Sequence, residues 1–185
     1  MSTSLVLGGS RSGKSNYAES LARGEKFYVA TAEISDGEMR DRIGAHQLHR
    51  GDSWRTIEEP LELARALQGI DAKGRFILVD CVTIWISNLM HTNRGVKAEV
   101  ERLCTVLKGM KARVVLVSNE VGQGIVPDNA LARAFRDEQG FANQRLAEAV
   151  NEVVLIVAGL PMVLKKARRK PASARRALSS RSRKA

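Results

Sequence analysis

The sequence has few cysteines and no apolar run long enough to cross a membrane. Its 185 residues include only two cysteines, Cys81 and Cys104, too few for a disulfide framework. No apolar stretch approaches the roughly 18 residues that span a bilayer, and the first residues lack the pattern of a secretory signal. We therefore expect a cytoplasmic protein without a membrane span. The length is that of a single domain with a sizeable core.

Acidic residues are missing from the last part of the chain. The formal net charge is +10, yet residues 165–185 hold ten Lys or Arg and no acid, so residues 1–164 are balanced with 20 of each sign. The low apolar content of this segment predicts disorder. We divide the chain into a domain over residues 1–165 and a basic tail over residues 166–185. The tail is either a solvated extension or a weak contact for RNA, DNA or anionic lipid.

Short apolar runs alternate with helical patterns through the domain. Runs without polar alternation are typical of parallel strands buried on both faces, so the pattern predicts an open α/β sheet flanked by helices. The expected strands cover residues 4–8, 26–31, 75–81, 112–119 and 151–159, with a shorter one at 53–59. The expected helices cover residues 14–23, 36–50, 60–68, 82–91, 96–110, 128–138 and 141–150.

A phosphate-binding motif follows the first expected strand. Residues 8–15 read GGSRSGKS and match G-x-x-x-x-G-K-[ST]. Glycines in such a loop let successive backbone N–H groups point at a phosphate, and the following helix adds its positive end. Lys14 then supplies a charge for the outer phosphates, and Ser15 a hydroxyl for Mg²⁺. The alternative is a glycine-rich turn that binds nothing.

Polar residues also end the other expected strands. Asp80 closes the run FILVD, as a magnesium-binding aspartate does in P-loop enzymes, although a strand-end acid can also cap the next helix. Residues 31–33 and 118–122 are polar or glycine-bearing at the ends of their runs. Because ligands bind beyond the carboxyl ends of parallel strands, these segments predict one binding rim. Cys81, Trp54 and Trp85 are expected to be packing residues.

A charged helical pattern carries two of the three histidines. Glu38, Arg42, His46 and Arg50 recur at intervals of four, which places them on one helix face. Arginines beside His46 would disfavour its cationic form and leave a neutral imidazole as a nucleophile. From spacing alone, a solvated face remains open, as does a metal site at His46 and His49, for which no third ligand is evident.

Long stretches of the chain resemble the bifunctional adenosylcobinamide kinase/adenosylcobinamide-phosphate guanylyltransferase family of cobalamin biosynthesis. The resemblance runs from about Leu5 to Lys165 in family order without a sizeable gap. The matching stretches are LVLGGSRSGKSNYAE, YVATAE, MRDRIGAHQLHR followed by WRTIEEP, ILVDCVTIWISNLM, and VVLVSNEVGQGIVPDNALARAFRDEQGFANQRLAEAVNEVVLIVAGLP. The basic tail is not part of the family pattern.

The resemblance implies specific roles at matching positions. The family's guanylylated histidine falls on His46. The implied nucleotide contacts are Gly8, Gly9, Ser10, Arg11, Ser12, Gly13, Lys14 and Ser15, then Thr31, Ala32 and Glu33, then Gln47, Leu48, His49 and Arg50, and finally Glu58 and Asp80. The group Gln47 to Arg50 matches by position more than by residue type. Lys14, His46 and Asp80 are the implied catalytic residues, with Ser15 and Asp80 holding Mg²⁺.

The resemblance further implies a RecA-like P-loop NTPase fold, a homotrimer and two reactions. GTP, or ATP in the first step, would phosphorylate the aminopropanol hydroxyl of adenosylcobinamide. GTP would then guanylylate His46, and the GMP would pass to the corrinoid phosphate to give adenosylcobinamide-GDP.

Three rival interpretations use the same residues differently. A P-loop small-molecule kinase without nucleotidyl transfer keeps Lys14 and Asp80 but leaves His46 on the surface. A nucleic-acid-binding module would use the tail, but the domain lacks the interleaved aromatics and the basic stripe of such surfaces. A nucleotide-dependent switch would need a partner surface that the sequence does not reveal.

Overall fold

The computed structural model describes residues 2–32 and 53–166. The expected helix 36–50 and most of the basic tail lie outside these ranges. The strands are β1 (Thr3–Gly8), β2 (Glu25–Ala30), β3 (Trp54–Glu58), β4 (Arg75–Asp80), β5 (Arg113–Asn119), β6 (Glu152–Val157) and β7 (Leu160–Lys165). The helices are α1 (Lys14–Ser20), α3 (Leu63–Gly69), α4 (Val82–His91), α5 (Val96–Gly109) and α6 (Ala130–Ala149).

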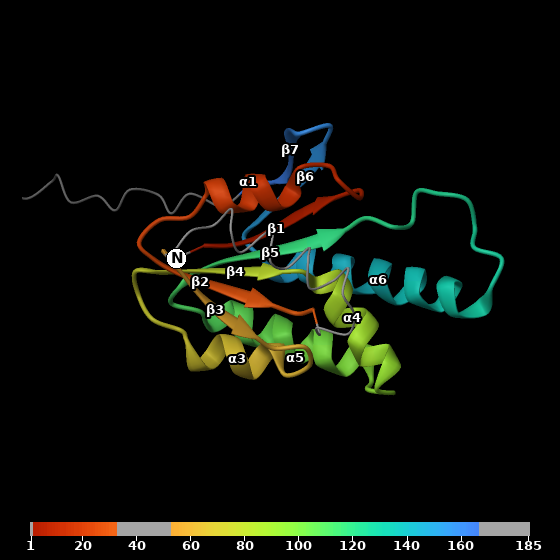
Figure 1. Cartoon of the computed structure of the whole chain (residues 1–185), viewed down its shortest axis with the longest axis horizontal. Helices are drawn as coiled ribbons and strands as arrows, with labels where there is room; N and C mark the ends of the chain where they lie inside the picture. Colours follow the sequence, from red (N-terminus) through yellow and green to blue (C-terminus); the bar gives the residue numbers. More distant parts are fainter. Residues whose placement is uncertain (1, 33–52, 167–185) are drawn as a thin grey trace, which may run out of the picture.

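The strands form one sheet in the order β3-β2-β4-β5-β1-β6-β7 (Figure 1). All neighbouring pairs from β3 to β6 are parallel, and only the β6–β7 pair is antiparallel. The expected α/β class, with a mostly parallel sheet flanked by helices, is confirmed. Because the strands run the same way, the ends of β1, β2, β3, β4 and β5 meet at one carboxyl edge.

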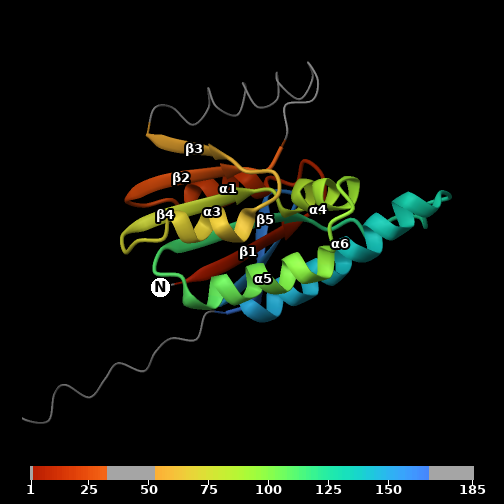
Figure 2. The same ribbon diagram turned by 90° about the horizontal axis from the view of Figure 1, so that it is seen from below.

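Helices cover the two faces of the sheet unequally. Side chains of α3, α4, α5 and α6 pack on one face, together with Leu5, Leu7, Ile77 and other strand residues. Of the described helices, α1 alone packs on the opposite face, against Val6 and its neighbours. Figure 2 shows α3, α5 and α6 in front of the strands when the molecule is seen from below. Alternate residues of each central strand are therefore buried on opposite faces, which explains the uninterrupted apolar runs.

The end of the chain departs from the predicted pattern. The run at 151–159 was expected to be one strand, but β6 ends at Val157 and the chain reverses at Ala158 and Gly159. These two residues have φ angles of 51° and 81°, the positive values that a two-residue hairpin turn needs. β7 then pairs with β6 as an edge strand, a place where Pro161 costs no ladder hydrogen bond.

The two helices expected at residues 128–138 and 141–150 form one continuous helix. The prediction of a break near Gly140 is wrong, because α6 continues from Ala130 to Ala149. Gln139, Ala142, Asn143 and Leu146 form one buried stripe across that position, and this packing outweighs the low helix propensity of glycine. The N-cap of α6 is Asn129, whose side-chain oxygen accepts a hydrogen bond from the Ala132 N–H at 2.7 Å.

We predict that Gly140→Ala stabilises the protein. A β-carbon there meets no atom within 4 Å, and alanine lowers the free energy of a helix interior by about 0.5–1 kcal/mol relative to glycine. The expected result is a rise in Tm of roughly 1–4 °C. The matched control is Gly24→Ala, where φ is +76° and a β-carbon would lie 2.5 Å from the Gly74 carbonyl oxygen. That variant should melt lower in the same thermal unfolding experiment, and a lower Tm for Gly140→Ala would contradict the continuous-helix packing.

Candidate active site

The phosphate-loop motif lies at the end of β1 and leads directly into α1 (Figure 1). Ser12 N–H donates to the Gly9 carbonyl at 3.3 Å, and Tyr17 N–H donates to the Gly13 carbonyl at 3.0 Å, which begins the helix. Gly13 has a φ of +94°, in the region that favours glycine. A β-carbon at Gly8 would lie 2.5 Å from Ser12 Oγ and 2.7 Å from the Ile156 carbonyl oxygen. The loop can therefore take this shape only with glycine at position 8.

The loop carries an unsatisfied polar group. Ser12 Oγ is buried and has no hydrogen-bond partner in the described structure. A buried hydroxyl without a partner is costly, so such atoms are rare in folded proteins and often mark ligand sites. Together with the glycines around it, this hydroxyl fits a loop shaped for an anion.

Lys14 is folded against the loop. Its side chain is buried, and Nζ donates to the Gly9 carbonyl at 2.8 Å. Burial lowers the pKa of Lys14, while Cys81 and Asp80 act in the opposite direction. Burial and the neighbouring Asp80 raise the pKa of the Cys81 thiol to about 11, so at neutral pH Cys81 carries no charge. Asp80 is therefore the anion that supports the charge of Lys14.

Asp80 is the last residue of β4 and pairs in register with Ala30 of the neighbouring strand β2. The Thr31 hydroxyl donates to the Cys81 carbonyl at 2.7 Å and accepts from the Cys81 N–H at 2.9 Å. Thr31 is fully buried, and its own carbonyl accepts a hydrogen bond from Asn88 Nδ2 at 2.7 Å. Thr31 thus fixes the chain beside Asp80, a supporting role that the sequence did not indicate.

The two residues expected to hold magnesium are both on the described edge. Ser15 stands in the first turn of α1, and Asp80 ends β4. Within residues 2–32 and 53–166, no group of three His, Cys, Asp or Glu side chains could hold a metal ion. The Ser15 hydroxyl and the Asp80 carboxylate fit Mg²⁺ rather than an ion held by protein groups alone. Mg²⁺ commonly takes one or two protein oxygens and completes its coordination shell with nucleotide phosphates and water.

Glu58 lies far along the edge from the phosphate loop. It ends β3 and pairs in register with Ala30, and β3 is four strands from β1. At about 4.8 Å per strand this separation is roughly 19 Å. Glu58 therefore cannot contact phosphates held at Lys14, and any nucleotide contact it makes is with a base or ribose.

The residues named from the sequence fall into two groups. The loop residues Gly8 to Ser15, Thr31, Ala32, Glu58 and Asp80 all lie at the carboxyl edge of the sheet. Glu33, His46, Gln47, Leu48, His49 and Arg50 lie outside the described residues. The predicted packing roles are confirmed, because Trp85 is fully buried, Cys81 is buried, and Trp54 makes edge contacts with Tyr28 and Phe76.

Two further segments hold the phosphate loop; residues 118–122 were expected at this rim, whereas the contact from the β6–β7 turn was not predicted. Gly159 N–H, in the β6–β7 turn, donates to the Ser12 carbonyl at 2.9 Å, and Glu120 N–H, after β5, donates to the Gly8 carbonyl at 3.0 Å. A cavity of about 450 Å³ lies between these segments and residues 9–12. Its lining does not include Lys14, Ser15 or Asp80.

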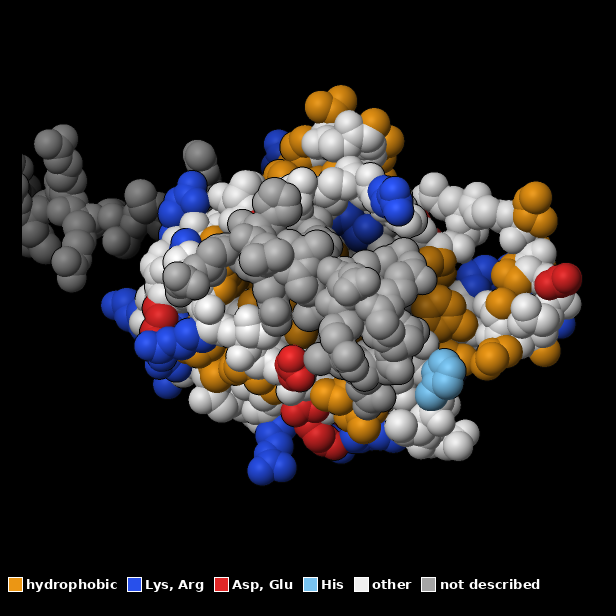
Figure 3. All heavy atoms as spheres, in the orientation of Figure 1, with side chains coloured by type: hydrophobic (Ala, Val, Ile, Leu, Met, Phe, Trp, Pro, Cys, Tyr) orange, Lys and Arg blue, Asp and Glu red, His pale blue; other side chains and the backbone are white. Residues whose placement is uncertain are grey.

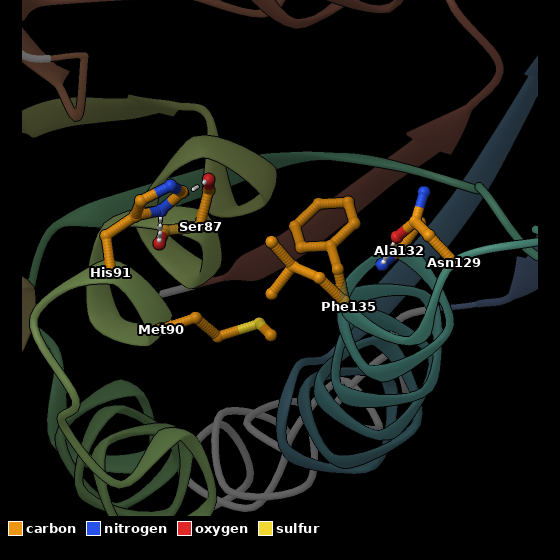
Figure 4. Close-up of a pocket in the computed structure, with 7 residues that line it drawn as sticks. Ser87, Met90, His91, Asn129, Ala132 and Phe135 are labelled. Carbon is orange, nitrogen blue, oxygen red and sulfur yellow. Dashed lines mark hydrogen bonds between the residues drawn. The ribbon is translucent and has the colours of Figure 1, made fainter.

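A second cavity of about 310 Å³ lies between α4 and the beginning of α6 (Figure 4). Met90 and Phe135 form apolar walls, with Ser87, His91, Asn129, Leu131 and Ala132 around them. His91 Nδ1 lies 2.8 Å from the Ser87 carbonyl oxygen, which can only accept. Nδ1 therefore carries a proton, which it donates to this oxygen.

The family model for cobinamide kinase / cobinamide phosphate guanyltransferase matches residues 4–164. The chain belongs to this family. It is 46% identical over 166 residues to the bifunctional adenosylcobalamin biosynthesis protein CobP of Pseudomonas aeruginosa, covering 87% of this chain and 96% of that protein. It is 39% identical over 178 residues to the bifunctional adenosylcobalamin biosynthesis protein CobU of Escherichia coli, covering 87% and 98%.

Solved P-loop NTPases share the fold of this cobinamide kinase family member. A type III secretion system ATPase aligns with a TM-score of 0.53 at 9% identity, over 88% of this chain and 56% of that chain. The flagellar accessory protein FlaH from Methanocaldococcus jannaschii aligns with a TM-score of 0.50 at 13% identity, over 89% and 78%. The expected P-loop NTPase fold is confirmed, and at such low identity these structures support nothing beyond it. No helix within the described ranges is long and apolar enough to cross a membrane.

We predict that affinity for a nonhydrolysable nucleoside triphosphate falls as pH rises, beginning below the ordinary lysine range. The lowered pKa of Lys14 means that its proton, and hence its positive charge, is lost at a lower pH than the usual 10.5. Losing a charged hydrogen bond to phosphate should weaken binding by about tenfold or more. Titrations from about pH 7.5 to 10 would measure the effect, with Lys14→Met as the control that should bind weakly at every pH. A wild-type affinity that changes no more with pH than the affinity of Lys14→Met would contradict this prediction.

Proposed function

We propose that this chain phosphorylates the aminopropanol hydroxyl of adenosylcobinamide and then transfers GMP from GTP to the resulting phosphate. The family match over residues 4–164 carries this proposal. The described edge supports it independently, because a buried Ser12 hydroxyl without a partner, a buried Lys14 and a neighbouring Asp80 make a site suited to a nucleoside triphosphate. These residues favour neither ATP nor GTP as the phosphoryl donor, since they are suited to phosphate groups, which both nucleotides share.

The kinase step uses positioning and charge. The loop from Gly8 to Ser15 holds the phosphates, and Lys14 leaves the Gly9 carbonyl to neutralise the charge that builds up on them. Mg²⁺, held by Ser15 and Asp80 together with the phosphates, would supply further charge neutralisation. The acceptor hydroxyl attacks the terminal phosphorus as the bond to the bridging oxygen breaks, and the hydroxyl proton is lost to water.

The nucleotidyl step requires a nucleophile, which we assign to His46. Its neutral imidazole attacks the α-phosphorus of GTP, pyrophosphate leaves, and a phosphoramidate forms. The corrinoid phosphate then displaces the imidazole and takes the GMP. We assign Glu58 to the ribose or base; its position about 19 Å from the phosphate loop by strand spacing supports this role rather than a phosphate contact. Gln47, Leu48, His49, Arg50 and Glu33 complete the proposed nucleotide contacts.

We expect an intact-protein mass increase of one guanylyl group after incubation with GTP and Mg²⁺. The adduct should be acid-labile, because phosphoramidates hydrolyse in acid, and it should be absent from His46→Ala. His49→Ala is the matched control, three residues away in the same segment, and should keep the adduct. An adduct lost only in His49→Ala would move the nucleophile to His49. No adduct in the wild type would leave the P-loop kinase without nucleotidyl transfer.

We infer that the protein forms a homotrimer in the cytoplasm with the corrinoid as its small-molecule substrate. Hydrophobic side chains gather on the β6–β7 hairpin (Figure 3), where Leu160, Met162 and Leu164 are all exposed. An exposed apolar surface of this kind supports an interface with a second copy. The two described cysteines are buried and unpaired, which agrees with a reducing compartment.

We predict that deletion of residues 168–185 leaves both half-reactions unchanged within about twofold. The family match ends at residue 164, and no proposed contact lies in the tail. Steady-state rates of phosphorylation and guanylylation in the full-length and shortened proteins would test this. A large loss of turnover at unchanged Tm would place the tail in the site. Weak RNA or DNA binding that disappears with the deletion, and falls steeply with salt, would assign the tail its alternative role.

A further inference from the structure

Asn119 occupies the strand position between the phosphate loop and Asp80. It ends β5, the strand that separates β1 from β4. In register, Asn119 is opposite Gly8, the first residue of the phosphate loop, while Asp80 is opposite Val117, two residues earlier on β5. A nucleotide with its phosphates at the loop and its magnesium at Asp80 must therefore pass close to the end of β5.

Strand alternation places Asn119 on the same face of the sheet as these groups. Val115 and Val117 pack on the α1 face, whereas Ser118 faces α6, so Asn119 follows Val117 on the α1 face. By the same alternation, Gly8 follows Val6, and Asp80 follows Leu78, on that face. The phosphate loop, the Asn119 side chain and the Asp80 carboxylate thus leave the sheet on one side.

The main chain of Asn119 is held firmly from behind. Its N–H donates to Thr83 Oγ1 at 2.7 Å, and its carbonyl accepts from Asn143 Nδ2 at 3.0 Å. Asn143 is itself fixed, because its Oδ1 accepts from Ser118 Oγ at 2.7 Å and from Gln139 Nε2 at 3.0 Å. Gln139 and Ser118 are fully buried, so a hydrogen-bonded network within the core orients the end of β5.

The carboxamide of Asn119 is not used by this network. Among the described residues, none makes a hydrogen bond to its side chain, and the residue is only partly buried. An amide on a rigid strand end, with two N–H donors free, is preorganised to bind an oxygen ligand. The carboxamide does not titrate, so its N–H groups donate at any pH. Unlike a carboxylate, it carries no charge that would repel phosphate.

We propose that Asn119 Nδ2 donates a hydrogen bond to the terminal phosphoryl group of the nucleotide bound at the phosphate loop. This assignment rests on the proposed kinase function. The hydrogen bond follows the terminal oxygens while the phosphorus leaves the bridging oxygen and joins the acceptor oxygen, so it stabilises the transition state together with Lys14. A nucleoside diphosphate has no terminal group at this position and receives no such bond.

The test compares affinities for a nonhydrolysable GTP analogue and for GDP in the wild type, Asn119→Ala and Asn119→Asp. We expect Asn119→Ala to weaken the analogue by about tenfold, the size of one hydrogen bond to a charged group, and to leave GDP within twofold. Asn119→Asp should weaken the analogue further through charge repulsion. The rate of corrinoid phosphorylation should fall with the analogue's affinity, at an unchanged Tm.

Asn143→Ala is the matched control for a purely structural effect. It removes the support of the Asn119 carbonyl but leaves the Asn119 carboxamide in place. We expect it to lower the Tm and to weaken both nucleotides alike. Equal weakening of GDP and the analogue in Asn119→Ala, or no weakening of either, would overturn the assignment. A wild type that binds neither nucleotide would instead overturn the proposed kinase function, so the two failures are distinguishable.

Discussion

The pairing of β1 with two parallel neighbours is the constraint from which the site follows. β5 and β6 fix β1 on both sides, and all six of its residues are buried. The chain can leave this strand only past Gly8, where Ser12 Oγ and the Ile156 carbonyl leave no room for a side chain. The loop, the first turn of α1 and the burial of Lys14 are consequences of that exit.

The carboxyl edge separates functions by strand. β1 presents the phosphate loop, β4 presents Asp80, and β5 between them presents Asn119. Thr31, directly after β2, holds Cys81 through its hydroxyl, and β3 at the far side carries Glu58. In the proposed function, phosphate chemistry would be concentrated on three adjacent strands, and the nucleoside would be recognised further along the same edge.

Much of this arrangement could be predicted from sequence, for reasons that differ by element. The phosphate loop and Asp80 are local signals, because each follows a buried apolar run, and their proximity follows from parallel strand order. The network behind Asn119 is not local: Ser118 meets Gln139 and Asn143 across a turn whose geometry the sequence does not fix. The hairpin was missed because its turn uses Ala158 at a positive φ, where asparagine or glycine is the usual signal.

The hydrogen bond from Gly159 to Ser12 joins the edge hairpin to the phosphate loop. The two elements therefore share one thermodynamic cycle. If nucleotide binding at the loop and a contact at the hairpin are coupled through this hydrogen bond, each changes the affinity for the other by the same coupling free energy. A partner bound to the exposed apolar side chains of β7 would therefore act on the phosphate loop through the turn at Gly159.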